Sequence, residues 1–270
     1  MTDYDKNVDF IIFGDGITSD VLSLVLKNSG KQFYVLGDDN IDQLPKSPRS
    51  LALSPSSMNL LNYFGIDFPV EELKKMKVYE SDLSNEKTKS ELIFDNEKTL
   101  SFVTKYYDLK KSLSKKTKND KRKIESKNFK SIELDKNYIK LFLKGGKKIC
   151  AKNIIFTQKI ESSLHSQLNL SYEEKNYNQK AIVATLKHKT PHNGIAYQFY
   201  DNGKPLALLP LTKDNSFFRS SLIWSLDNYL ADDILSNDDL REILNIKLGA
   251  LFKNIEISEG PISFELDKFF

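Results

Sequence analysis

Hydrophobic positions near the start of the chain follow a strand–helix–strand pattern. Residues 10–13 form a short apolar run that Gly14 ends, which indicates a buried parallel strand. From Ile17 onward, apolar side chains recur at helical spacing until an Asn-Ser-Gly sequence, where Gly30 favours the end of a helix. A second apolar run over residues 32–37 predicts the next strand. The pattern therefore predicts a βαβ unit with parallel strands and a right-handed crossover.

Two further helices and a β meander are predicted before residue 160. In the segment SPSSMNLLNYFG, Ser54 fits the N-cap, Pro55 the first turn and Gly65 the end of a helix. Another helix is predicted over residues 107–116. Short strands separated by turn residues are expected at 132–134, 138–143, 148–150 and 154–156.

The pattern changes after about residue 175. Four strand-like runs follow one another, AIVATLKHK, GIAYQFY, PLALLPL and FRSSLIWSL, and residues 201–203 favour a hairpin turn between two of them. A last helix is predicted over residues 238–252, with Ser236 and Asp239 as a capping box. The order of elements predicts an α/β fold that begins with a Rossmann-like βαβ unit and becomes mainly antiparallel β.

The composition excludes several classes of protein. The chain has 270 residues, of which 40% are hydrophobic, so it can bury a sizeable core. Its only cysteine is Cys150, which excludes an intrachain disulfide, and one Cys with three scattered His predicts no metal site. The polar N-terminus and the absence of an apolar run near 18 residues predict a cytoplasmic protein without a signal peptide or membrane span.

Charge is nearly balanced overall but concentrated in one stretch. The chain has 40 Lys and Arg against 37 Asp and Glu, and residues 110–130 are its densest basic segment. Such a segment suits a nucleic acid, an anionic membrane surface, or simply a solvated helix end and loop. It contains one Arg (Arg122) and one aromatic residue (Phe129), fewer than base stacking and bidentate phosphate contacts favour. We therefore prefer the solvated surface and predict no nucleic-acid partner.

The loop between the first strand and helix has the form G-x-G-x-x-S. In a dinucleotide loop, the first glycine allows a tight turn, the second lets the backbone approach a pyrophosphate, and the third permits close helix packing. Gly14 and Gly16 meet the first two needs, and Ser19 stands at the third. Asp15 stands between the glycines, and a carboxylate about 4 Å from a phosphate would oppose binding by about 4 kcal/mol unless its side chain points away from the ligand. The loop alone fits a dinucleotide site and an ordinary βα turn equally well.

An acidic residue at the end of the second strand would bind the ribose hydroxyls of a dinucleotide. Gly37 stands at the usual place, with Asp38 and Asp39 directly after it. Asp38 is a candidate if the strand ends one residue later. A solvated loop acid is the equally good alternative.

Longer stretches resemble a known family. The segments RSLALSPSSMNLLNYFGI (residues 49–66), NYNQKAIVATLKHKTPHNGIAYQFYDNGKPLALLPL (176–211) and SSLIWSL (220–226) resemble, in order and spacing, motifs of the FAD-dependent hydroxylases of ubiquinone biosynthesis. These enzymes have the para-hydroxybenzoate hydroxylase fold, in which a mainly antiparallel β substrate domain interrupts the FAD-binding domain. The resemblance implies an FAD-binding domain over residues 1–75 and 100–175 and a substrate domain over 76–99 and 176–270, incomplete at the C-terminus.

The same resemblance implies a reaction and its partners. It implies FAD-dependent hydroxylation of the ring of a polyprenylated phenol, with NAD(P)H as electron donor. Gly14, Gly16, Ser19, Asp38 and Arg49 would be the cofactor-binding residues, with Arg49 near the flavin and its phosphates. Other ubiquinone-biosynthesis proteins and peripheral contact with the inner face of the membrane are expected, and no residue stands out as catalytic.

The sequence also departs from the family pattern. The family's second fingerprint, G-A-D-G-x-x-S-x-v-R, falls on residues 156–168, where Gln158 and Lys159 replace Asp-Gly and His165 replaces Arg. Tyr107 stands where an Arg is expected, and the G-D-A-A-H segment that contacts the FAD pyrophosphate would lie beyond residue 270. These departures support two alternatives: a non-catalytic homologue that acts as a binding or assembly subunit, or a truncated fragment.

Overall fold

The computed structural model describes residues 5–38, 46–82, 87–95, 98–118, 120–160, 162–168, 170, 174–201 and 203–269. The chain packs as two compact units, each made of two stretches of sequence. Unit 1 comprises residues 1–44 and 110–173, and unit 2 comprises residues 45–109 and 174–270. The mixed α/β content and the mainly antiparallel second unit confirm the predicted fold class.

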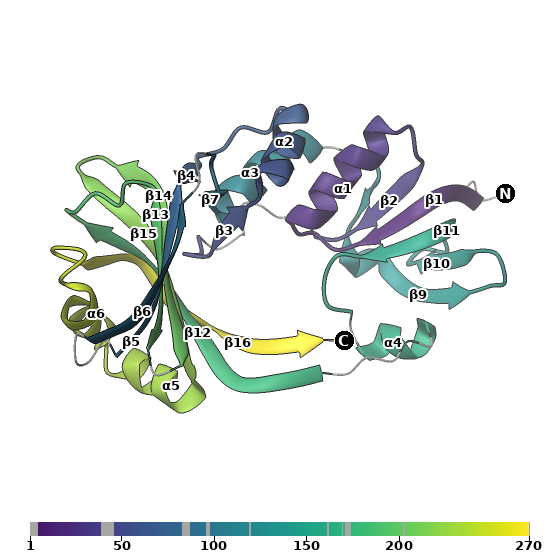
Figure 1. Ribbon diagram of the computed structural model, residues 1–270. Coiled ribbons are helices and arrows are strands. Elements are labelled where there is room, and N and C mark those ends of the chain that lie inside the picture. Colours follow the sequence, from purple (N-terminus) through teal and green to yellow (C-terminus); the bar gives the residue numbers. More distant parts are fainter. Residues whose placement is uncertain are drawn as a thin grey trace. The chain divides into compact units, whose positions relative to one another are not determined.

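Unit 1 is built on a six-stranded mixed sheet with the order β8-β2-β1-β11-β10-β9. Its strands are β1 (Asp5–Phe13), β2 (Phe33–Leu36), β8 (Lys123–Ile124), β9 (Phe129–Leu134), β10 (Ile139–Leu143) and β11 (Lys148–Phe156). Strands β8, β2, β1 and β11 run parallel, and β10 and β9 continue the sheet as an antiparallel meander. Helix α1 (Ile17–Asn28) connects β1 to β2 (Figure 1), which confirms the predicted parallel βαβ unit.

Apolar side chains fill both faces of this sheet. Ile12, Phe33 and Val35 pack with Leu26 of α1 on one face. Ile11 and Phe13 point to the other face, and they belong to a second buried cluster with Val8, Leu36, Ile132, Leu141, Leu143, Ile149 and Ala151, together with Leu164 and Leu168 of α4 (Ser162–Leu168). Because neighbouring strand residues point to opposite faces, the unbroken apolar run at 10–13 marks a strand covered on both sides.

The helix boundaries predicted from capping residues are confirmed. Ser54 is the N-cap of α2 (Pro55–Tyr63), and its Oγ accepts a hydrogen bond from the Ser57 amide at 3.1 Å. Gly30 and Gly65 follow α1 and α2 with φ angles of +68° and +64°, a conformation that favours glycine. Helix α3 (Tyr106–Thr117) lies within one residue of its predicted bounds.

Unit 2 contains a seven-stranded sheet with the order β16-β12-β15-β14-β13-β5-β6. Its strands are β5 (Lys75–Asp82), β6 (Lys87–Asp95), β12 (Glu174–His188), β13 (Ile195–Asp201), β14 (Lys204–Asp214), β15 (Phe217–Asp227) and β16 (Glu256–Phe269). Neighbouring strands are antiparallel except β13 with β5. A smaller antiparallel sheet, β3-β7-β4, is made of β3 (Ser50–Leu53), β4 (Glu71–Leu73) and β7 (Ser101–Lys105).

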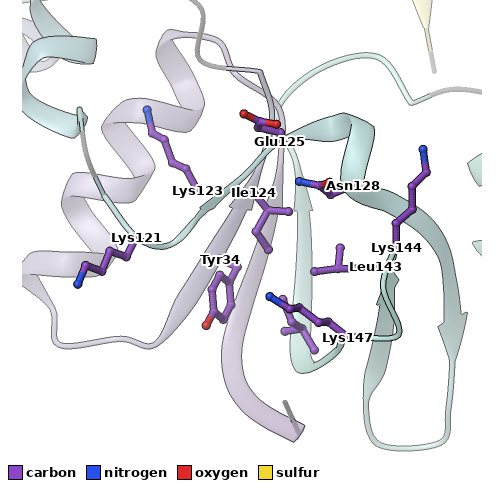
Figure 2. A pocket seen from close by; sticks show the side chains of 10 residues that line it. Tyr34, Lys121, Lys123, Ile124, Glu125, Asn128, Leu143, Lys144 and Lys147 are labelled. Atoms are coloured by element: carbon purple, nitrogen blue, oxygen red, sulfur yellow. The ribbon is translucent and has the colours of Figure 1, made fainter. Parts of the chain in front are cut away.

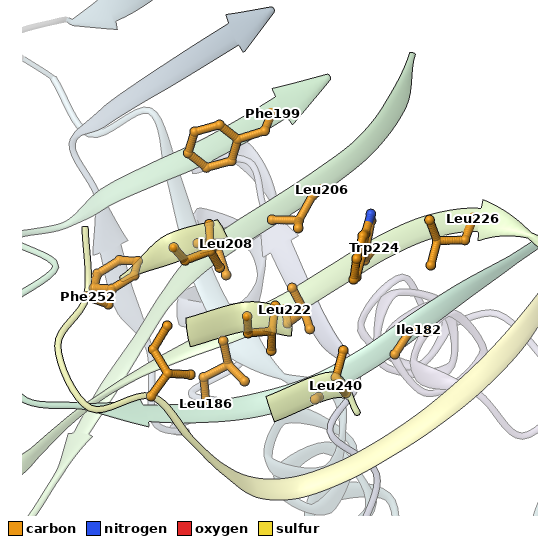
Figure 3. Close-up of a cluster of buried hydrophobic side chains, with 14 of the residues drawn as sticks. Ile182, Leu186, Phe199, Leu206, Leu208, Leu222, Trp224, Leu226, Leu240 and Phe252 are labelled. Atoms are coloured by element: carbon orange, nitrogen blue, oxygen red, sulfur yellow. The ribbon is translucent and has the colours of Figure 1, made fainter. Parts of the chain in front are cut away.

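Two helices complete the core of unit 2. Helices α5 (Asn228–Ser236) and α6 (Leu240–Leu248) lie against the seven-stranded sheet (Figure 1). Figure 3 shows Leu240 and Phe252 among strand residues of the same buried cluster, including Leu186, Leu222 and Trp224. The four runs predicted as strands after residue 175 are confirmed as β12 to β15. Their alternation is only partial because residues 181–186 of β12 are all buried, which shows that both faces of this strand are covered.

Three local predictions were wrong. The single helix expected over residues 238–252 is α6, which is shorter, and α5 before it was missed. Ser236 does not cap a helix: it is the last residue of α5, and its Oγ donates to the Asp233 carbonyl at 3.0 Å. Asp238, with a φ of +60°, turns the chain between the two helices. In unit 1, the two strands expected at 148–150 and 154–156 are one continuous strand, β11.

The expected division of the chain also differs from the packing. Residues 45–75 and 100–109 were expected with the FAD-binding domain, but they group with unit 2. The reason is strand pairing, because β7 joins β3 and β4 in one sheet. Val103 of β7 also packs with Leu211 of β14. Which unit binds cofactor and which binds substrate stays a prediction.

Candidate cofactor-binding site

Gly14 connects β1 to the loop before α1 in a conformation that favours glycine. Its φ is +134°, and its amide donates to the Leu36 carbonyl of β2 at 2.9 Å. A Cβ at this position would lie 2.2 Å from Oγ1 of Thr157, which itself donates to the Phe13 carbonyl. The carboxyl ends of β1, β2 and β11 therefore surround Gly14, and a side chain there would displace one of them.

The amino end of α1 offers hydrogen-bond donors. Gly16 is the N-cap and has no side chain to accept a hydrogen bond from the first-turn amides. The first N–H groups of a helix lack partners within it, and the helix dipole makes this end positive. Ser19 is 1% exposed, and its Oγ has no hydrogen-bond partner among the described residues. These groups suit the oxygens of a phosphate.

A buried ion pair follows directly in the first turn of α1. Asp20 is 3% exposed, and its carboxylate accepts a hydrogen bond from Lys110 Nζ at 2.6 Å. Lys123 Nζ lies 3.6 Å from the same carboxylate. Two ammonium groups thus face one carboxylate, and part of the basic stretch over residues 110–130 is used inside unit 1. This group leaves no signal in the sequence, because Asp20 and Lys110 are 90 positions apart.

A small recess opens between the loop and the end of β2. Its lining consists of Gly14, Asp15, Ser19, Asp20, Val35, Gly37 and Lys123. The free volume is about 10 Å³, room for about one water molecule. A dinucleotide is far larger, so it would lie across the mouth of the recess with only small groups facing inward.

The end of β2 lies against the loop. A Cβ on residue 37 would be 2.8 Å from the Gly14 carbonyl oxygen and 2.9 Å from Cβ of Asp15. Asp15 is exposed. Asp38 is exposed as well, and its Oδ1 accepts a hydrogen bond from the Ser126 amide at 2.8 Å. Asp39, the other acid considered, lies outside the described residues.

Arg49 lies in unit 2, just before β3. Its side chain is exposed, and its guanidinium carbon lies 4.9 Å from the centroid of the Tyr106 ring, a cation–π contact. Its carbonyl accepts a hydrogen bond from the Tyr106 amide at 2.9 Å, which fixes the backbone where α3 begins. The four other predicted cofactor residues belong to unit 1. The role of Arg49 beside flavin and phosphates therefore stays a prediction.

The segment at the altered second fingerprint directly follows β11. Because β11 runs parallel to β1, its carboxyl end meets the loop, and Thr157 donates its backbone amide to Phe13 at 2.9 Å. The side-chain oxygen of Gln158 would lie 3.3 Å from a Cβ on Gly14. This segment therefore contacts the glycine loop, although Gln158 and Lys159 replace the Asp-Gly of the family pattern. Its contact with Gly14 follows from the parallel pairing, which the sequence analysis did not use.

Two histidines that match family motif positions serve packing and hydrogen bonding. In unit 2, His188 is 1% exposed, with Nε2 2.9 Å from Ser220 Oγ and Nδ1 2.7 Å from the Thr190 carbonyl. His192 Nε2 lies 3.0 Å from the Leu211 carbonyl. Burial lowers the pKa of His188 to about 4, so its ring is neutral near pH 7. Both nitrogens of His188 are occupied within the protein, which leaves none for acid–base chemistry.

A larger cavity lies elsewhere in unit 1, on the sheet face opposite α1. It has a volume of about 600 Å³ and is lined by Tyr34, Lys121, Lys123, Ile124, Glu125, Asn128, Leu143, Lys144, Lys147 and Ile149. Figure 2 shows Ile124 and Leu143 between Lys121 on one side and Lys144 on the other. The lysine chains surround the cavity without converging on one point, so the glycine loop remains the better candidate site.

Curated proteins similar in sequence act in ubiquinone biosynthesis. The ubiquinone biosynthesis monooxygenase COQ6 of Danio rerio is 24% identical over 258 residues, which cover 86% of this chain and 52% of that protein. The ubiquinone hydroxylase UbiL of Rhodospirillum rubrum is 24% identical over 106 residues, 39% of this chain and 24% of that protein. The chain thus spans about half the length of the first relative. No protein-family model matches the chain.

Solved structures with the same fold are FAD-dependent monooxygenases and their relatives. The p-nitrophenol 4-monooxygenase PnpA of Pseudomonas putida superposes with a TM-score of 0.71 at 14% identity, over 98% of this chain and 69% of that one. PqsL of Pseudomonas aeruginosa, titled a probable FAD-dependent monooxygenase, gives 0.70 at 14% identity, over 96% and 74%. The chain is therefore similar in sequence to monooxygenases of ubiquinone biosynthesis, and it has the fold of solved FAD-dependent monooxygenases.

Proposed function

We propose that this chain binds FAD at the glycine loop and acts as a monooxygenase. The proposed reaction is hydroxylation of the aromatic ring of a polyprenylated phenol in ubiquinone biosynthesis, with NAD(P)H as electron donor. The observation that carries the proposal is the geometry of the loop between β1 and α1. Its backbone is held by three parallel strand ends, and it leads into a helix end with donors and no side-chain cap.

The residues of unit 1 fit the pyrophosphate of such a cofactor. Gly14 and Gly16 would let the backbone approach the phosphates, and the first-turn amides of α1 would donate to their oxygens. The buried hydroxyl of Ser19, which lacks a partner among the described residues, would gain one from a phosphate oxygen or a bridging water. FAD, when bound, supplies the oxygen-transfer chemistry, and the protein supplies binding, orientation and exclusion of water.

The substrate class rests on the relatives. Their names place them in ubiquinone biosynthesis, in agreement with the motifs at residues 49–66 and 176–211. We propose that the seven-stranded sheet of unit 2 forms the substrate-binding part. Among the described residues, every helix is too short or too polar to span a lipid bilayer. Peripheral contact with the inner membrane face and association with other ubiquinone-biosynthesis proteins are part of the proposal.

The proposal is tested by reconstituting the purified chain with FAD. After removal of free flavin, we expect the visible absorbance of bound flavin and quenching of flavin fluorescence, both lost in a Gly16→Asp variant that places a carboxylate at the N-cap. Oxygen uptake that requires both NAD(P)H and a polyprenylated phenol would then support the reaction. A colourless protein after reconstitution contradicts the proposal.

A non-catalytic binding or assembly subunit is the second candidate. It is favoured by Gln158 and Lys159 in place of Asp-Gly next to the loop, and by Asp38, whose Oδ1 is bound to the Ser126 amide. This candidate predicts binding of a polyprenylated phenol without NAD(P)H oxidation. Turnover of the phenol by the reconstituted chain contradicts it.

A further inference from the structure

We infer that Asp15 is the ribose-binding acid of this site, in place of the acid that other dinucleotide folds carry at the end of β2. The ligand feature it would recognise is the hydroxyl pair of an adenosine ribose. The inference rests on the proposed function and assigns a binding role to a residue that, judged from sequence, either opposes phosphate binding or points away from the ligand.

A side chain at the end of β2 would collide with the loop between β1 and α1. Gly37 occupies the strand-end position, and a Cβ there would lie 2.9 Å from Cβ of Asp15 and 2.8 Å from the Gly14 carbonyl. Distances below 3.0 Å are not tolerated between such atoms. A side chain on residue 37 is therefore excluded as long as the loop at Gly14 and Asp15 keeps its place. The side chain of Asp15 begins 2.9 Å from the point where the side chain of a strand-end acid would begin.

Hydrogen bonds fix this close approach of the loop to the end of β2. The Gly14 amide donates to Leu36 at 2.9 Å, which ties the loop to β2 one residue before Gly37. The Gly37 amide donates to the Ile124 carbonyl at 3.0 Å, which ties the strand end to β8. Neither backbone can move away without losing a hydrogen bond of about 1 kcal/mol. The loop and the strand end lie too close together for both residues 15 and 37 to carry a side chain. In this chain, Asp15 carries one and Gly37 does not.

The carboxylate of Asp15 is available to a ligand. Asp15 is exposed and makes no hydrogen bond or ion pair with the residues that the structure describes. Asp38, the alternative acid, accepts from the Ser126 amide with Oδ1. A carboxylate without partners at the mouth of the recess can accept hydrogen bonds from two ribose hydroxyls, as a strand-end acid does.

Because Asp15 is charged, the direction in which FAD affinity changes on its replacement tests the inference. If the carboxylate faced the phosphates, replacing it by an amide would strengthen FAD binding; if it accepts from the ribose, the replacement weakens binding. We expect Asp15→Asn to raise the dissociation constant of FAD roughly tenfold, because a hydrogen bond to a charged acceptor is lost. The matched control is Asp135→Asn, which removes the same charge from an exposed position in the meander.

A competition experiment separates recognition of the ribose from a change in the loop. We expect ADP to displace FAD from the natural chain roughly tenfold better than 2′-deoxy-ADP, and both to compete equally against Asp15→Asn. Unchanged or tighter FAD binding by Asp15→Asn overturns the inference. So does weaker binding in Asp38→Asn alone, which would assign the role to Asp38. Failure of the natural chain to bind FAD at all overturns the proposed function itself, so the two failures are distinct.

Discussion

Gly14 and Thr157 are 143 positions apart in the sequence and in contact in the fold. The Oγ1 atom of Thr157 lies where it would be 2.2 Å from a Cβ on residue 14, and it donates to the Phe13 carbonyl at 3.0 Å. Parallel pairing of β1 with β11 produces this contact, because it brings the carboxyl ends of both strands to the same edge of the sheet.

Gly14→Ala is expected to destabilise the protein by about 3 kcal/mol. The positive φ alone costs about 1–2 kcal/mol for a residue with a side chain, and the contact with Thr157 adds to it. The control is Gly145→Ala, with a φ of +81° and no atom within 4 Å of the added Cβ, for which only the first part applies. Urea denaturation measures both. Equal losses in the two variants would contradict the contact.

Asp20→Asn is expected to destabilise unit 1 by about 3–5 kcal/mol, because it leaves Lys110 as a buried charge without its carboxylate. The side chains of Lys110 and Asp20 are 6% and 4% exposed. The control is Asp135→Asn, whose ion pair with Lys140 has the same 2.6 Å distance but a carboxylate that is 50% exposed, so a much smaller loss of stability is expected. Similar denaturation midpoints for the two variants would show that the buried pair contributes no more to stability than the exposed pair.

Ser19→Ala is expected to leave the stability of the cofactor-free protein unchanged or raise it by about 1 kcal/mol. The Ser19 hydroxyl is buried without a partner among the described residues, so its removal ends a desolvation penalty. Ser23→Ala is the matched change one turn later, and it should cost about 1 kcal/mol because the Ser23 hydroxyl donates to the Ser19 carbonyl at 2.7 Å. Thermal melting of both variants without FAD measures the difference, and a loss in Ser19→Ala would reveal an existing hydrogen bond.

His188 is expected to make stability depend on pH. Burial against the rings of Phe252 and Phe218, with His192 nearby, lowers its pKa in the folded state to about 4 from 6.5. Above pH 6.5 the ring is neutral in both states and the stabilisation is complete. As the pH falls from about 6.5 to 4, the unfolded chain binds the proton first, and about 3 kcal/mol of stability is lost.

The measurement is the free energy of unfolding between pH 7 and 4 for the natural chain and for His188→Gln. The Gln side chain has no titrating group, so the variant should show a shallower slope over this window. An identical slope would assign the pH dependence to other groups. His165, the histidine of unit 1, provides a control substitution with Gln.

Many of the strands and helices of this protein could be predicted from local sequence. The strands and helices of the first βαβ unit, the cap of α2 at Ser54 and the four strands after residue 175 depend on side-chain period and on capping residues, which act within a few positions. The same local logic failed at Ser236, because a hydroxyl near a helix end can close the previous helix as readily as it begins the next.

The loop shows the limit of such reasoning. Its glycines were visible as a motif, but the sequence left Asp15 as an obstacle and Gly37 as a missing acid. Only the fold shows that Asp15 and a side chain on residue 37 would collide, because hydrogen bonds between β1, β2 and β8 bring the loop against the strand end. The partners Lys110 and Thr157 were equally hidden, since contacts between distant positions leave no periodic signal in a single sequence. Local pattern determined the elements and the family resemblance; tertiary packing decided which side chains meet at the site, because strand order and strand direction together fix which carboxyl ends lie side by side.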